Sequence, residues 1–422
     1  MRLKPMPFVF TTCLSRDRLR DCALLLLTVF VLPTVACAQI ESSSEQPEAE
    51  TKGLSSSPIA NERFVATSEG YMLPYTETIE ELGLELEMVP IPAGKLEFDR
   101  RQFSNAEKLL QRKAGEAEVS IDVPAFWMGK YEITWEQYVH YAGLYGAMKK
   151  RIRAEDLEDV SIEEPDAVTA PTEIYDPRSR FELLSSKQCP AFSMSQFAAK
   201  QFTKWLSIRT GGEYRLPSEA EWTYACLAGE PISQFQPLSD AKLKEQALFG
   251  HGDIGPEKVG QREANAWDLH DMLGNVSEYV LDSDGKSLFN RMPNGRFEHW
   301  KSVGMAKTRF TTVACGGNFS CDPDYCTPFS RLRIDESYWD SEANIPLSIS
   351  WLGTPDKQTT IGFRVVRSLE KLPADRREQC WRPDNEDLDF DLEMKLQGGR
   401  GVVGRIPVPD EYPRSPIDLL GK

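Results

Sequence analysis

Two cysteines, Cys321 and Cys326, are separated by four residues in the segment Cys-Asp-Pro-Asp-Tyr-Cys. Thiolates are soft donors of the kind that suits Cu(I). Two thiols this close in the sequence can also form a small local disulfide, which needs no catalytic purpose. The spacing therefore indicates either a soft-metal and redox site or a structural bridge.

A second segment, from Asp271 to Glu278, concentrates hard oxygen donors. Its two carboxylates flank Gly274 and Val276, whose backbone carbonyls could point into the same tight loop. Two carboxylates and two carbonyls are suitable ligands for Ca2+. We predict a structural calcium site at these four residues, and the alternative is a solvated acidic turn.

Several other chemistries are excluded. The chain has 4 histidines, which are too few and too dispersed for a multi-histidine metal centre. The stretch from Gly255 to Gly260 lacks the Lys and hydroxyl residues that follow in a phosphate-binding loop. A net charge of -16 and a pI near 4.9 argue against unaided binding to nucleic acid or anionic lipid.

The N-terminus has the pattern of an export signal. Two arginines precede an apolar run over residues 23–36, and Ala36-Cys37-Ala38 supplies the small residues of a cleavage site. We assign residues 1–38 to a signal peptide and expect an exported protein, periplasmic or secreted. An uncleaved membrane anchor or a lipid on Cys37 is the alternative, and no later apolar run is long enough to span a membrane.

Export bears on the remaining cysteines, because an oxidising compartment favours disulfides when the number of thiols is even. Six cysteines remain after loss of the signal peptide, an even number that favours disulfides: Cys189, Cys226, Cys315, Cys321, Cys326 and Cys380.

Composition divides the rest of the chain into three parts. Residues 39–81 begin with a stretch rich in Ser, Glu and Pro, which predicts a disordered linker. Residues 82–370 carry recurring aromatic residues and turns, as expected of a globular domain. Residues 371–422 are predicted to be an acidic, Gly- and Pro-rich tail, solvated or laid over the body.

Local patterns predict the elements that position these residues. Thr134 to Gln137 and Ser218 to Glu221 are capping boxes, and Ser195 can cap a helix that ends at Gly211. Alternation over residues 361–367 predicts a half-buried strand with Ile361, Phe363 and Val365 on one face. Helices, short strands and long loops together indicate an irregular α+β fold. Four tryptophans are expected in the core: Trp127, Trp135, Trp205 and Trp222.

Six short stretches occur in a characteristic order. They are Met88-Val-Pro-Ile-Pro-Ala-Gly94, Phe126-Trp-Met-Gly-Lys-Tyr-Glu-Ile-Thr134, Tyr214-Arg-Leu-Pro-Ser-Glu-Ala-Glu-Trp-Thr-Tyr224, Leu269-His-Asp-Met-Leu-Gly-Asn-Val276 with Glu278, Gly316-Gly-Asn318 and Gly362-Phe-Arg-Val365. Together they resemble the sulfatase-modifying factor family, which includes the formylglycine-generating enzyme. The resemblance runs roughly from Leu82 to Ser368 and implies a variant of the C-type lectin-like fold with little regular secondary structure.

The resemblance also implies an activity, the O2-dependent and copper-dependent conversion of a sulfatase cysteine to formylglycine. Cys321 and Cys326 would hold the copper and carry the redox chemistry, with Tyr325 and Asn318 as neighbouring catalytic residues. The partner would be a protein substrate that carries a sulfatase cysteine motif. Enzymes of this family also resemble this chain in the arrangement of the calcium loop predicted above.

Two positions depart from the pattern of the family's enzymes. Ser277 stands where they have Trp, and Asn318 stands where they have Ser. The segment Asp-Pro-Asp-Tyr, followed by Arg331, also resembles family members that lack the cysteine pair. The alternative is therefore a non-catalytic lectin-like module that binds or assembles with an envelope protein.

Overall fold

The computed structural model describes residues 51–60, 62–99, 103, 118–142, 186–192, 194–283, 286–305, 311–335 and 360–382. All of them belong to the unit formed by residues 50–422. The predicted signal peptide lies outside the described residues. Within these ranges, no helix is both long and apolar enough to cross a lipid bilayer.

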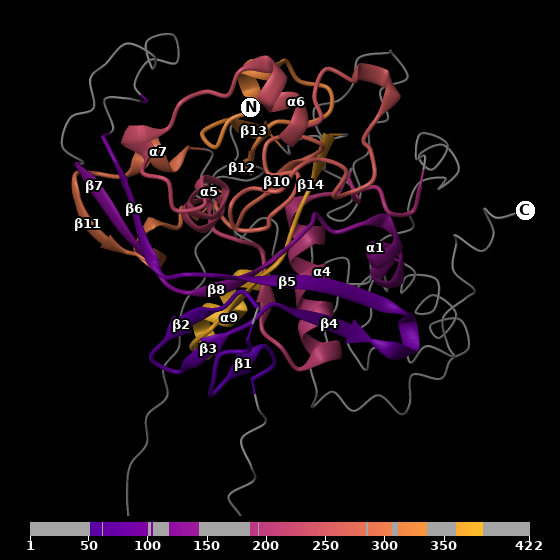
Figure 1. The fold of residues 1–422 in the computed structure, drawn as a ribbon, viewed down its shortest axis with the longest axis vertical. Helices are drawn as coiled ribbons and strands as arrows, with labels where there is room; N and C mark the ends of the chain where they lie inside the picture. Colours follow the sequence, from indigo (N-terminus) through magenta and orange to yellow (C-terminus); the bar gives the residue numbers. More distant parts are fainter. Residues whose placement is uncertain are drawn as a thin grey trace, which may run out of the picture. The chain divides into compact units, whose positions relative to one another are not determined.

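The strands are short and belong to four sheets (Figure 1). They are β1 (Leu54–Ser55), β2 (Val65–Thr67), β3 (Gly70–Met72), β4 (Tyr75–Ile79), β5 (Leu84–Ile91), β6 (Gly94–Phe98), β7 (Val119–Val123), β8 (Phe126–Gly129), β9 (Tyr214–Arg215), β10 (Ser277–Tyr279), β11 (Gly295–Glu298), β12 (Thr311–Cys315), β13 (Arg331–Asp335), β14 (Ile361–Gly362) and β15 (Val366–Ser368). The largest sheet has the order β4-β5-β8-β15-β9, and the next has the order β13-β12-β10-β14. Two three-stranded sheets have the orders β1-β3-β2 and β11-β7-β6.

Helices connect and cover these sheets. The α-helices are α1 (Trp135–Ala142), α4 (Gln196–Thr210), α5 (Glu219–Leu227), α6 (Asp240–Gln246), α7 (Leu288–Arg291), α8 (His299–Ser302) and α9 (Ala374–Trp381). Single 3-10 turns are η1 (Glu80–Leu82), η5 (Ile232–Gln234), η6 (Gly252–Ile254) and η7 (Pro323–Tyr325). The mixture of helices and sheets confirms the predicted α+β class.

The three predicted helix starts are confirmed by their caps. Ser218 accepts a hydrogen bond from the backbone N–H of Glu221, whose side chain accepts from the backbone N–H of Ser218. Thr134 and Gln137 make the same reciprocal pair at the start of α1. Ser195 caps α4, and Gly211 ends it with a φ of 73°, a left-handed conformation that glycine adopts without strain.

The predicted half-buried strand over residues 361–367 is wrong. The segment is divided between β14, which pairs in parallel with β10, and β15, which pairs antiparallel with β8. Every residue from 361 to 367 is buried, so neither face is solvated. The alternation failed as evidence because Arg364, the polar residue between the two strands, is buried in an ion pair with Glu278.

The predicted disordered linker is wrong, whereas the first part of the predicted tail is laid over the body, one of the two alternatives for it. Strands β1 to β4 lie in the segment assigned to a disordered linker, and Met72 and Ile79 belong to the main core. The predicted tail begins with α9, whose Trp381 is buried and donates a hydrogen bond from its indole Nε1 to the carbonyl of Tyr214, at 2.9 Å. In both cases a few apolar side chains anchor a segment whose average composition is polar.

The core consists mainly of two clusters. One surrounds α4 and the five-stranded sheet and contains Trp127, Trp135 and Trp205. The other surrounds α5 with β6 and β7 and contains Trp222. The four tryptophans are at most 2% exposed, which confirms their predicted place in the core.

Candidate active site

Cys321 and Cys326 lie at either end of η7, and their sulfur atoms are 3.6 Å apart. Cys326 is buried in a small apolar cluster with Leu243 and Ala247, whereas Cys321 is partly exposed. All six cysteines that were expected to favour disulfides are free thiols in this structure. The turn therefore brings together a buried and an accessible thiol.

Hydrogen bonding makes the two thiols chemically different. The hydrogen bond from Cys326 lowers the pKa of Cys321 to about 7, aided by the backbone N–H of Asn318 and opposed by burial. The same sulfur contact, together with burial, raises the pKa of Cys326. Cys321 is thus the more acidic thiol of the pair, and charge on sulfur is what makes a thiol nucleophilic and metal-binding.

Gly317 lies directly against both sulfur atoms. A Cβ atom added at this position would fall 2.8 Å from Cys326 Sγ and 3.0 Å from Cys321 Sγ. It would also fall 2.9 Å from the carbonyl oxygen of Leu273. Only glycine lets the backbone approach the thiols this closely, so Gly317 is a requirement of the site.

The other two predicted catalytic residues lie on the same loop but are placed differently. Asn318 is 9% exposed, and its backbone N–H donates to Cys321 Sγ at 3.3 Å. Tyr325 is 61% exposed, in η7 between the two cysteines. Asn318 therefore acts on the thiol directly, whereas Tyr325 is available to a molecule that approaches from solvent.

A neighbouring loop, residues 248–254, was missed as part of the site. Its Gly250 and His251 donate backbone hydrogen bonds to the carbonyls of Cys321 and Phe319, at 3.0 and 2.6 Å. Ile254, in η6 of the same loop, is 73% exposed. Gly250 and Gly252, both at positive φ, were the available signal of a tight loop, but nothing in the sequence pairs it with Cys321.

The four residues of the predicted calcium site have other partners in this structure. Both carboxylate oxygens of Glu278 bind the guanidinium of Arg364, at 2.6 Å each, and one also accepts from the indole of Trp222 at 2.8 Å. Asp271 accepts from the backbone N–H of Gly260 at 2.7 Å. The geometry thus gives Glu278 the role of an ion-pair partner.

The remaining two residues of that segment are fixed through their backbone. Gly274 packs against Leu248, whose carbonyl oxygen would lie 2.4 Å from an added Cβ. Val276 donates its backbone N–H to Glu132 at 3.0 Å. The backbone of the loop is therefore held closely by its neighbours at both positions.

Glu132 was missed as a member of this buried group. It is 1% exposed and accepts from the side-chain amide of Asn275 at 2.7 Å. Burial raises its pKa well above the usual range, and the charges of Asp271 and Glu278 raise it further.

Among the described residues there is no group of three or more His, Cys, Asp or Glu side chains arranged to hold a metal ion. The calcium and copper sites stay predictions.

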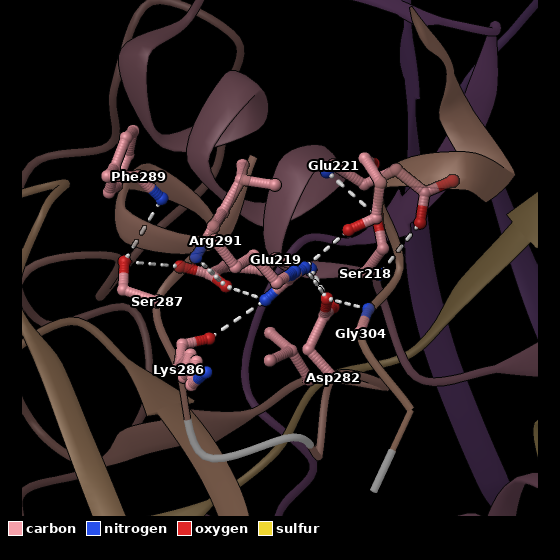
Figure 2. A network of polar contacts seen from close by, with 12 residues as sticks. Ser218, Glu219, Glu221, Asp282, Lys286, Ser287, Phe289, Arg291 and Gly304 are labelled. Atoms are coloured by element: carbon pink, nitrogen blue, oxygen red, sulfur yellow. Dashed lines mark hydrogen bonds and ion pairs between the residues drawn. The ribbon is translucent and has the colours of Figure 1, made fainter. Parts of the chain in front are cut away.

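A second polar network centres on the buried carboxylates of Glu219 and Asp282 (Figure 2). Arg291 forms ion pairs with Glu219, at 3.1 Å, and with Asp282. Asp282 also accepts a hydrogen bond from the backbone N–H of Gly304. Arg331, the first residue of β13, donates to Glu219 at 2.6 Å and lies over the ring of Trp222. Since Arg331 follows Cys326 by a short loop, this network holds one end of the thiol site in place.

The model of the Sulfatase-modifying factor enzyme 1-like domain matches residues 77–369. Treponema denticola variable protein 1 is 17% identical, with 70% of this chain and 99% of that chain covered and a TM-score of 0.44. PvdO from Pseudomonas aeruginosa is 22% identical, with 70% and 98% covered and a TM-score of 0.42. CarF is 17% identical, with 68% and 99% covered and a TM-score of 0.38. No curated protein sequence matches significantly.

Proposed function

Since this chain belongs to the sulfatase-modifying factor family, we propose that it is an exported oxidase of the formylglycine-generating type. Its substrate would be a cysteine in a sulfatase-like protein, which it converts to formylglycine with O2. The family's C-type lectin-like architecture is part of the proposal, and export is proposed from the N-terminal pattern. The observation that carries the activity is the thiol pair, with sulfur atoms 3.6 Å apart and one of them accessible.

The residues present fit copper as the cofactor. Two thiols beside each other, one with its pKa lowered to about 7, are a soft donor set for a single Cu(I) ion. The absence of a side chain at Gly317 leaves the two sulfur atoms uncrowded. Cys321 and Cys326 would hold the ion, and bound copper would supply O2 activation.

The chain's own groups have distinct roles in this proposal. The backbone N–H of Asn318 stabilises charge on Cys321, and the apolar cluster around Cys326 keeps water from that sulfur. Tyr325 and Ile254 are exposed on the two loops that meet at Cys321, so an approaching peptide would contact them. Together they favour a protein substrate that presents its cysteine to an accessible thiol.

Oxidation of a model peptide tests this function. A peptide with the pattern Cys-x-Pro-x-Arg should yield an aldehyde when incubated with reduced protein, Cu(I), O2 and a thiol reductant. The carbon that bears the thiol takes one oxygen atom and becomes the aldehyde, and its sulfur leaves as hydrogen sulfide. The second oxygen atom becomes water by taking two electrons and two protons from the reductant. Mass spectrometry and an aldehyde-reactive probe detect the product, and a peptide with Ser in place of Cys is the control. If the cysteine peptide gives no aldehyde, the non-catalytic binding module is the better description.

We also propose that the Asp271 to Glu278 loop binds Ca2+, with ligands from Asp271, Gly274, Val276 and Glu278. A chelator should then lower the melting temperature, because an ion bound only by the folded state stabilises that state. The matched variant is Asp271→Asn, since Asp271 has a φ of 60° that asparagine tolerates, and it should remove the sensitivity. An unchanged melting temperature of the wild type would identify the loop as an acidic turn held by Arg364.

A further inference from the structure

Ser277 and Asn318, far apart in the sequence, are in direct contact. Ser277 is 1% exposed, and its hydroxyl accepts a hydrogen bond from the side-chain amide of Asn318 at 3.1 Å. The same hydroxyl lies 3.2 Å from the carbonyl oxygen of Gly317, to which it can donate. One hydroxyl therefore holds two consecutive residues of the thiol loop.

Those two residues are the ones that touch the sulfur atoms. Gly317 lies against both thiols, and Asn318 donates its backbone N–H to Cys321 Sγ. The backbone carbonyl of Asn318 accepts a hydrogen bond from the backbone N–H of Cys321 at 3.2 Å. The side-chain oxygen of Asn318 accepts a hydrogen bond from the backbone N–H of Ser320 at 3.0 Å. The amide of Asn318 thus joins the turn that carries Cys321 to the hydroxyl of Ser277.

Ser277 stands on a rigid support. It is the first residue of β10, which is paired on one side with β12 and on the other with β14. A central strand offers a fixed position from which a side chain can orient a loop, and such supporting residues set the precision of a site. The contacts run from the sheet, through Ser277 and Asn318, to the sulfur of Cys321.

We propose that Ser277 is a positioning residue of the thiol pair, which fixes Gly317 and Asn318 and thereby the placement of Cys321 beside Cys326 for a soft metal ion. That this ion is Cu(I) rests on the proposed function. The hydrogen bonds that support it do not depend on turnover.

The first test measures Cu(I) affinity by competition with a chromophoric Cu(I) chelator. In Ser277→Ala the buried amide of Asn318 loses its acceptor, and we expect Cu(I) to bind about 10-fold more weakly, as for other losses of a residue that supports a metal ligand. Ser277→Thr keeps the hydroxyl and should restore the affinity. Ser320→Ala removes a neighbouring hydroxyl that makes none of these bonds and should bind like the wild type.

A second readout needs neither copper nor activity. Oxidised glutathione exchanges with the two thiols to give a Cys321–Cys326 disulfide and two reduced glutathiones. The equilibrium constant for this exchange, measured by alkylation and mass spectrometry, reports how the thiols are placed. It should change in Ser277→Ala, with Ser277→Thr and Ser320→Ala close to the wild type.

The outcomes separate the two proposals. A change in either readout that Ser277→Thr restores supports the positioning role, even if the wild type forms no aldehyde. No change in either readout overturns it, and so does an equal change in Ser320→Ala. Should Ser277→Ala fail to fold, Asn318→Ala removes the other end of the same bond, and unchanged readouts in that variant overturn the proposal as well.

Discussion

Replacing either Cys321 or Cys326 with serine is expected to abolish aldehyde formation from the cysteine peptide. Each change removes one of the two soft donors, and a hydroxyl at neutral pH is neither charged nor a ligand that suits Cu(I). In either variant the remaining sulfur would hold the ion alone, and in Cys326→Ser the Cys321 sulfur also loses the contact with the Cys326 thiol that lowers its pKa. Turnover and bound copper should therefore disappear together in both variants.

The folded state should survive these substitutions. Cys321 is partly exposed, so Cys321→Ser costs little, whereas Cys326→Ser places a hydroxyl in an apolar cluster at a cost of about 1–3 kcal/mol. Cys380→Ala is the matched control, because Cys380 is buried near the end of α9, outside the thiol loop. Near-ultraviolet circular dichroism and the melting temperature report folding. A folded Cys321→Ser protein that still forms aldehyde would show that the thiol pair is not the oxidase site.

Local features of the sequence were sufficient for much of this molecule. A capping box such as Ser218 with Glu221 is complete within four residues, and the cysteine pair needs only one turn to bring its sulfur atoms together. Each could be predicted because the partners are neighbours in the chain and the physics of one turn decides the result. The order of the family's motifs then gave the domain.

Partners distant in the sequence could not be predicted in this way. Glu278 was interpreted with its neighbours as a calcium ligand, and nothing in the sequence indicated that its carboxylate also binds Arg364, 86 residues later. Ser277 and Asn318 were noted separately as departures from a pattern, and only the fold shows that they bond to each other across 41 positions. A single sequence records which polar residues are present but not which of them will meet in the core.

Breaking the ion pair between Glu278 and Arg364 is expected to have the largest effect on stability. Arg364 is fully buried and also donates to the backbone carbonyls of Gly129 and His270, at 3.0 and 2.9 Å. Glu278→Gln leaves the charge of Arg364 without its ion-pair partner. Arg364→Met leaves the Glu278 carboxylate with the Trp222 indole as a donor but without its counter-charge, and it removes the Arg364 donor from both carbonyls. Either change should lower the free energy of unfolding by about 3–5 kcal/mol, the usual cost of an uncompensated buried charge.

Urea denaturation of the two single variants and of Glu278→Gln/Arg364→Met measures this coupling. Because the double variant contains no isolated charge at the pair, it should lose less stability than the sum of the two single losses. Arg296→Ala is the matched control: its guanidinium forms a similar two-bond pair with Asp122, but both side chains are exposed, so water screens the pair and stability should barely change. If the single losses simply add, Glu278 and Arg364 do not stabilise the protein as a pair. If a calcium chelator destabilises the wild type as much as Glu278→Gln does, Glu278 acts on stability through a bound ion, and the ion pair is secondary.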